Sequence, residues 1–286
     1  MTAASTPSAF DLQKGLGSTV RLHDGNLMPV FGLGVYQSPP GSTTREAVES
    51  ALQVGYRLID TAALYRNEKD VGEAIRASGI DRSEVFLTTK LWNADQGYDS
   101  ALAAFEQSRR ALGVEAVDLY LIHWPVTGKR SESWRALRKI QEMGGARSIG
   151  VSNYAIPHLE ELLAESDVVP AVNQVEFSPF LFQSELLQFC QKRGIQIEAY
   201  APLTRGKRLE DPRVTRIAKA HGTTSAAVLI RWGLQHSVVE IPKSVRPERI
   251  RDNAGAFTFS LTEEEMSMLN GLNEGLRVSW DPSEMR

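Results

Sequence analysis

The chain has 286 residues, of which 42% are hydrophobic and 23% charged, and its formal net charge at pH 7 is −3. Such values are ordinary for a globular protein that buries a substantial core. The charge balance and the lack of any run of four Lys or Arg exclude nucleic acid as an expected partner. No apolar run approaches the roughly 18 to 20 residues of a membrane span, so we expect no membrane partner. Because residues 1–17 also lack the features of a secretion signal, we expect a cytoplasmic protein.

The first residues suggest a leader and then a hairpin. Residues 1–17 are loose in composition and are predicted to be a flexible leader, followed by a single domain over residues 18–286. Two short apolar runs, 19–22 and 27–30, flank the sequence His-Asp-Gly-Asn. Because Asp-Gly supplies the positive φ of a tight turn, we predict a β-hairpin here. Its expected role is to close the bottom of the fold as a plug.

From residue 31 onward, short buried strands alternate with helical patterns. A capping box at 43–46 is predicted to begin the first helix, which ends at Gly55. Strands are predicted at 31–36, 57–62, 85–90, 118–124, 146–151, 171–176, 196–200 and 238–241. Eight such units over about 250 residues, without a long linker, favour an α/β protein of the (β/α)8 TIM barrel type. An open, doubly wound sheet is the alternative.

Polar side chains stand where neighbouring predicted strands end. Asp60, Lys90 and His123 close the second, third and fourth strands, and Tyr65 lies in the loop after the second. Each residue alone has an ordinary explanation, such as a turn cap, a solvated loop residue or a satisfied core histidine. Together they are more informative, because the carboxyl ends of parallel strands converge on the face where barrel proteins bind ligands.

This group of side chains suits proton transfer to a carbonyl oxygen. A lysine that ends a buried strand needs a partner, and Asp60 on the next strand can hold Lys90. We expect Tyr65 to be the general acid, with its pKa lowered from about 10 by the adjacent ammonium. His123 would hydrogen-bond the same carbonyl oxygen, orient it and stabilise developing negative charge.

Three motifs then identify a resemblance. They are Gly-Tyr-Arg-Leu-Ile-Asp-Thr-Ala-Ala-Leu-Tyr at 55–65, Thr-Lys-Leu-Trp at 89–92 and Asp-Leu-Tyr-Leu-Ile-His-Trp-Pro at 118–125. In this order they resemble the catalytic signatures of the aldo-keto reductase superfamily, and the likeness extends over residues 19–273. The resemblance implies a tetrad, Asp60, Tyr65, Lys90 and His123, that reduces aldehydes and ketones with a nicotinamide cofactor and without a metal.

The second half of the chain resembles the cofactor site of that family. By resemblance, Ser152, Asn153 and Gln174 bind the carboxamide of the nicotinamide, and Tyr200 stacks on its ring. Ala201 stands where the family often has Ser, which leaves its role open. The remaining residues that the resemblance assigns to the cofactor are Leu203, Lys243, Ser244, Arg249 and Asn253.

The cluster of Lys243, Ser244 and Arg249 also has a meaning of its own. Two cations and a hydroxyl at a strand end and helix start suit a phosphate, although a solvated basic turn is the ordinary alternative. With the resemblance, the cluster favours NADPH as the cofactor. The glycine fingerprint of a Rossmann dinucleotide site and the phosphate loop are both absent from the sequence. The histidines show no paired ligand spacing, and Cys190 is expected to be core, so we predict no metal site.

Tyr36, Trp92 and Trp124 flank the loops after the first, third and fourth strands and are predicted to wall the substrate pocket, although each could be core. Aromatic walls around one polar corner favour a range of small carbonyl substrates. The short loop after Trp124 and the short tail resemble compact bacterial-type members of the family, among them those named 2,5-diketo-D-gluconate and glyoxal reductases. We expect a monomer.

Two other functions are kept open at this point. Some proteins similar to this family bind the cofactor but serve as regulatory or structural proteins, and an intact tetrad does not exclude that role. A barrel hydrolase that works through the carboxyls of Asp60 and Glu68 is the weaker alternative, since hydrolysis gives Lys90 no clear task.

Overall fold

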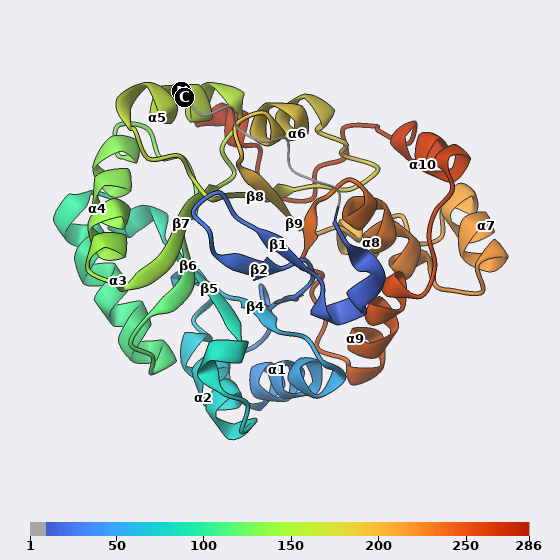
Figure 1. The fold of residues 1–286 in the computed structure, drawn as a ribbon, viewed down its shortest axis with the longest axis horizontal. Helices are drawn as coiled ribbons and strands as arrows, with labels where there is room; N and C mark the ends of the chain where they lie inside the picture. Colours follow the sequence, from blue (N-terminus) through green and yellow to red (C-terminus); the bar gives the residue numbers. More distant parts are fainter. Residues whose placement is uncertain (1–9, 286) are drawn as a thin grey trace.

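The computed structural model describes residues 10–285, which fold as a parallel barrel surrounded by helices (Figure 1). Its eight strands follow the order β10-β9-β8-β7-β6-β5-β4-β3. The two ends of this order meet, because the Gly32 N–H donates to the Glu240 carbonyl at 2.9 Å and the Glu240 N–H donates to that of Val30 at 3.0 Å. The prediction of a (β/α)8 barrel is therefore confirmed, and the open sheet was the wrong alternative.

The bounds of the elements follow the predicted alternation. The barrel strands are β3 (Leu33–Gly34), β4 (Leu58–Asp60), β5 (Phe86–Leu91), β6 (Val117–Ile122), β7 (Ala146–Ser152), β8 (Val172–Glu176), β9 (Gln196–Tyr200) and β10 (Val239–Glu240). The α-helices are α1 (Ser42–Val54), α2 (Glu68–Ala77), α3 (Tyr98–Leu112), α4 (Arg130–Glu142), α5 (Ile156–Glu165), α6 (Ser184–Gln191), α7 (Pro212–Ala220), α8 (Ser225–Gln235), α9 (Pro247–Ala254) and α10 (Glu263–Asn270). The 3-10 helices are η1 (Leu12–Gly17), η2 (Ala63–Tyr65), η3 (Arg82–Glu84), η4 (Asn93–Asp95), η5 (Thr204–Gly206), η6 (Gly255–Phe257) and η7 (Pro282–Glu284).

The strands read as continuous apolar runs because both of their faces are buried. In β6, Leu119 and Leu121 belong to the core inside the barrel, whereas Tyr120 and Ile122 belong to the core between the barrel and its helices. All four are fully buried. This alternation within one apolar run is what a parallel strand covered on both faces requires.

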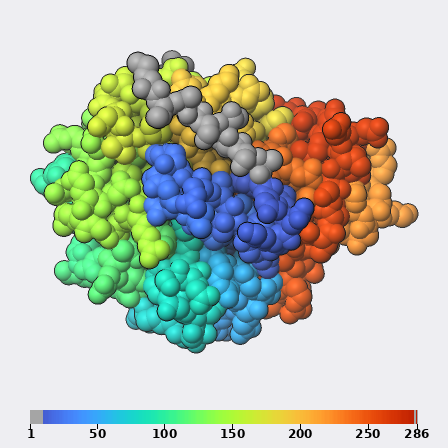
Figure 2. Space-filling model, in the orientation of Figure 1, coloured from blue at the N-terminus to red at the C-terminus, as the bar shows by residue number. Residues whose placement is uncertain are grey.

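The predicted hairpin is present and lies across one end of the barrel. Its strands are β1 (Thr19–Arg21) and β2 (Leu27–Pro29), paired antiparallel. Met28 is fully buried and packs into the inner core, and the side-chain amide of Asn26 donates to the Arg147 carbonyl at 3.2 Å. Because Arg147 lies near the start of β7, the hairpin covers the amino-terminal ends of the strands. The hairpin lies over the centre of the face drawn in Figure 2, so ligands must enter at the opposite, carboxyl-terminal end.

Two local expectations differ from the structure. The first helix begins at Ser42 and is preceded by Gly41, so Thr43 lies inside its first turn and is not the N-cap. The predicted capping box at 43–46 is therefore wrong. Of the predicted leader, residues 1–9 lie outside the described residues, and Leu12–Gly17 forms η1, whose leucines pack against the main core. Among residues 10–285, no helix combines the length and apolar character needed to cross a membrane.

Candidate active site

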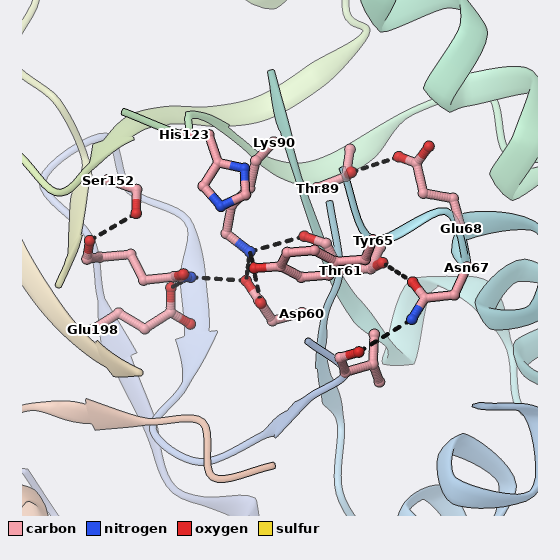
Figure 3. A network of polar contacts seen from close by, with 12 residues as sticks. Asp60, Thr61, Tyr65, Asn67, Glu68, Thr89, Lys90, His123, Ser152 and Glu198 are labelled. Atoms are coloured by element: carbon pink, nitrogen blue, oxygen red, sulfur yellow. Dashed lines mark hydrogen bonds and ion pairs between the residues drawn. The ribbon is translucent and has the colours of Figure 1, made fainter. Parts of the chain in front are cut away.

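The carboxyl ends of three adjacent strands place the predicted catalytic residues together (Figure 3). Asp60 is the last residue of β4, Lys90 lies near the end of β5, and His123 follows β6 directly. They are buried, with 2%, 0% and 6% of their surfaces exposed. Tyr65 ends the short helix η2, which brings its ring back over the barrel. The structure thus assembles all four side chains of the predicted tetrad.

Lys90 makes the contacts that a buried ammonium needs. Its Nζ donates to both carboxylate oxygens of Asp60 at 2.7 Å, to the Thr61 carbonyl at 2.8 Å and to the Tyr65 hydroxyl at 3.4 Å. The predicted pairing with Asp60 is therefore present. Hydrogen bonds and an opposite charge offset the desolvation of the ammonium, which explains how a lysine can occupy this site.

The pKa of Tyr65 is not lowered, which differs from the prediction. Burial raises the pKa of Tyr65 well above its usual value, and the negative charge of Asp60 raises it further. Burial is the largest cause, because a phenolate at this position would lose its contact with water. Tyr65 is consequently protonated at neutral pH, and a protonated phenol is the form that can donate a proton.

His123 is a neutral imidazole beside the phenol. Burial lowers its pKa well below the usual value, and the positive charge of Lys90 lowers it further. The ring lies edge-on to Tyr65, with a centroid distance of 5.6 Å, and it lines the same cavity. Its Nδ1 is buried and has no hydrogen-bond partner within residues 10–285. A neutral imidazole has one N–H, so it can still donate one hydrogen bond to a ligand.

A cavity of about 860 Å³ extends from these residues along the carboxyl end of the barrel. Ser152, Asn153 and Gln174 line it, as predicted for a carboxamide site. Asn153 is held from two sides, because its amide donates to the His123 carbonyl at 2.9 Å and accepts from the Tyr200 hydroxyl at 2.7 Å. The aromatic ring of Tyr200 is thereby fixed at the cavity wall, where a planar ligand could stack on it.

Glu198 belongs to this network and escaped the sequence analysis. The Gln174 Nε2 donates at 2.7 Å to both Asp60 and Glu198, which leaves the amide oxygen of Gln174 to accept a hydrogen bond from a ligand. Burial raises the pKa of Glu198 to about 8, and the charge of Asp60 contributes to the rise. The signal that could have indicated this role is the position of Glu198 on a barrel strand, two residues before Tyr200, so that both side chains point to the same face.

The predicted phosphate cluster lines the far end of the same cavity. Lys243 and Arg249 are exposed on its wall, whereas Ser244 and Asn253 are buried. Leu203 also lines the cavity, together with Arg246 and the beginning of α8. Cations and a hydroxyl at one end, with amides and an aromatic ring at the other, fit the phosphates and the nicotinamide of a dinucleotide.

The substrate end carries more aromatic surface than the sequence predicted. Tyr36 and Trp124 line the cavity, whereas Trp92 packs beside it, with its ring 5.4 Å from that of His123. Trp280 also lines the cavity, and its ring centroid lies 5.4 Å from that of Trp124. The sequence analysis missed Trp280 because it lies in an irregular tail, where no strand or helix pattern indicates which way a side chain points.

The carboxyl of Glu68 does not face this cavity. It is mostly buried beneath α2, where it accepts a hydrogen bond from the Thr89 hydroxyl at 2.6 Å. Burial raises the pKa of Glu68, and the hydrogen bond with Thr89 opposes that rise. Asp60 is itself bound to Lys90. The two acids of the hydrolase alternative therefore do not flank a common space.

The fold and these side chains first define a class of protein. It is a (β/α)8 barrel whose polar site lies at the carboxyl ends of the strands, where barrel enzymes have their active sites. Residues 30–274 match the model of the aldo/keto reductase family, and the chain belongs to that family. The protein is therefore an oxidoreductase of a family that acts on carbonyl compounds with a nicotinamide cofactor.

Several named proteins are similar over nearly their whole length. A glyoxal reductase from Bacillus subtilis is 49% identical over 270 residues, which cover 94% of this chain and 98% of the relative. A 9,11-endoperoxide prostaglandin H2 reductase from Trypanosoma cruzi is 47% identical over 92% of this chain and 94% of its own. A solved structure of a mutant of Gox0644 in complex with NADPH is 43% identical, has a TM-score of 0.88 and is matched over 93% of this chain and 97% of its own.

Proposed function

We propose that this protein reduces aldehydes and ketones, dicarbonyls among them, to alcohols, with NADPH as the hydride donor and Tyr65 as the general acid. The observation that carries the proposal is the position of the Tyr65 hydroxyl, 3.4 Å from the Lys90 ammonium on the wall of the main cavity. The glyoxal reductase among the relatives and the NADPH in a similar structure support the dicarbonyl substrate and the cofactor.

The residues divide the work around the carbonyl oxygen. The Tyr65 hydroxyl donates its proton to that oxygen, and the neutral His123 donates a hydrogen bond that orients it. As the proton leaves, negative charge develops on the phenol oxygen, and the nearby ammonium of Lys90 stabilises it. Asp60 fixes the ammonium through both carboxylate oxygens. In this mechanism none of the four side chains needs to bind a metal.

The other end of the cavity supports the choice of NADPH over NADH. The two cofactors differ by a 2′-phosphate, which needs charge-assisted hydrogen bonds to leave water. Lys243, Ser244 and Arg249 offer two cations and a hydroxyl on one wall. Arg249 can grip a phosphate with its planar fork, whereas a ribose hydroxyl would leave both cations without a counter-charge.

The direct test is the oxidation of NADPH in the presence of glyoxal, methylglyoxal and a panel of small aldehydes and ketones. We expect turnover with several of them, because aromatic side chains wall the substrate end of the cavity around the Tyr65 hydroxyl. Tight NADPH binding without turnover of any compound would overturn the proposal and favour the alternative, a cofactor-binding regulatory or structural protein.

A further inference from the structure

The last described residues return over the carboxyl end of the barrel and are held at several points. The backbone N–H of Leu276 donates to the Phe180 carbonyl at 2.9 Å. At the far end, the Met285 carbonyl lies 2.9 Å from the His158 Nε2. Between these points, residues 278–280 line the main cavity. The tail is thus part of the wall of the candidate active site.

Glu176 holds the middle of this tail. It is the last residue of β8 and is 2% exposed. One carboxylate oxygen accepts the backbone N–H of Val278 at 2.7 Å, and the other accepts that of Ser279 at 3.0 Å. A buried carboxylate is costly without such partners, and hydrogen bonds to a charged group are the stronger kind. The strand end and the tail therefore stabilise each other.

The residue that follows these two hydrogen bonds is Trp280. Its ring lies 5.4 Å from Trp124 and 6.4 Å from Trp92, measured between centroids, and it remains 59% exposed. An indole held in place with its face open is a surface for an apolar group. Ser279 lines the same cavity as Tyr200, so the tail borders the proposed cofactor end as well.

We propose that Glu176 is a positioning residue, which fixes the tail at Val278 and Ser279 so that Trp280 completes the aromatic wall of the substrate pocket. This wall favours the binding of carbonyl compounds with a flat apolar group beside the reacting carbon, such as aryl aldehydes and aryl dicarbonyls. This inference rests on the proposed carbonyl reductase function, but the hold on the tail can be tested without any turnover.

The first test uses trypsin and the bond between Arg277 and Val278, because the N–H of that bond is the one that Glu176 accepts. Glu176→Ala should release residues 278–286 at least about 10-fold faster than the parent, as measured by mass spectrometry. Glu176→Gln keeps one acceptor oxygen and should lie between the two. Glu185→Gln, which changes an exposed acid on α6, should leave the rate at the parental value.

The second test compares phenylglyoxal with methylglyoxal, which differ by an aromatic ring. Trp280→Ala should raise KM for phenylglyoxal about 3- to 10-fold more than KM for methylglyoxal, because the stacking surface is lost. Glu176→Ala should show the same selective rise. The double variant should be no worse than either single one, because both changes remove the same wall.

The outcomes separate the two proposals. An unchanged rate of tail release in Glu176→Ala, with the fold checked by circular dichroism, would overturn the role of Glu176. Faster release with equal changes in both KM values would overturn the link to Trp280. An enzyme that turns over no carbonyl compound contradicts the proposed function, while the trypsin assay still decides whether Glu176 holds the tail.

Discussion

Lys90 and Asp60 form an ion pair in which one ammonium meets both carboxylate oxygens at 2.7 Å, with side chains that are 0% and 3% exposed. Each charge depends on the other, because neither reaches water. The ammonium of the pair also lies beside the Tyr65 hydroxyl (Figure 3). A change in either residue therefore affects stability as well as the proposed chemistry, and the two effects can be measured separately.

Lys90→Met should destabilise the protein by about 3 to 5 kcal/mol, because it leaves the carboxylate of Asp60 buried without its counter-charge. Urea denaturation measures this difference. The double variant Lys90→Met with Asp60→Leu should regain part of the lost stability, since neither buried charge then remains. Turnover should be lost in both variants. A Lys90→Met enzyme with parental activity would remove Lys90 from the mechanism.

Tyr65→Phe should lower kcat by about 10²-fold or more, because it removes the proton donor and keeps the ring. The ring still packs against Tyr36 and His123, so the fold and the dissociation constant of NADPH should change little. Steady-state kinetics and a binding titration measure the two effects. Turnover equal to that of the parent would show that another group supplies the proton.

Glu198→Gln should make stability less dependent on pH. The pKa of Glu198 rises from its ordinary 4.5 to about 8 on folding, so the folded protein binds more protons than the unfolded chain between these values. Its contribution is thus fully present below pH 4.5 and is lost as the pH rises through about 8. The stability of Glu198→Gln relative to the parent should therefore increase with pH, by at most about 1.4 kcal/mol per unit.

Urea denaturation between pH 5 and pH 8 checks this prediction. A control that leaves the network intact is Glu185→Gln on α6, which should follow the parent at every pH. A constant difference between Glu198→Gln and the parent across the range would mean that Glu198 is ionised throughout. The buried network would then hold two carboxylates, Asp60 and Glu198, with the Lys90 ammonium as their shared counter-charge.

The barrel and the tetrad could be predicted from sequence because both follow from strand ends. A strand buried on both faces is a short apolar run, and a charged residue that closes it, such as Lys90, marks the carboxyl end. The capping box at 43–46 failed because the helix starts at Ser42, after Gly41, which places Thr43 within the first turn. The spacing of a capping pattern does not fix the residue at which a helix begins.

The electrostatics and the tail were beyond sequence reasoning for a different reason. The pKa of Tyr65 depends first on its burial and then on the charge of Asp60, and both follow from the assembled barrel. Glu176 meets the backbone of Val278 and Ser279 across about a hundred residues of sequence, in an irregular tail where no periodicity indicates direction. Such contacts are products of the closed barrel, and only its geometry reveals them.

Arg249→Ala should weaken NADPH binding by about 10- to 100-fold and leave NADH binding almost unchanged, since one charged contact is worth roughly 1.5 to 3 kcal/mol. Titration of both cofactors with the parent and the variant gives the four dissociation constants. Arg251→Ala is the matched control, because Arg251 is exposed on the same helix and does not line the cavity. Equal weakening of both cofactors would show that Arg249 does not read the 2′-phosphate.

The barrel closes where β3 and β10, the two edge strands of its sheet, meet. The N–H of Gly34 donates to the Pro242 carbonyl at 3.3 Å, and a Cβ at Gly34 would lie 2.9 Å from the Ile241 carbonyl, so the two edges touch without side chains between them. Lys243 is bridged to Gly34 directly across this joint. A dinucleotide held by Lys243 would therefore contact the place where the first strand of the barrel meets the last.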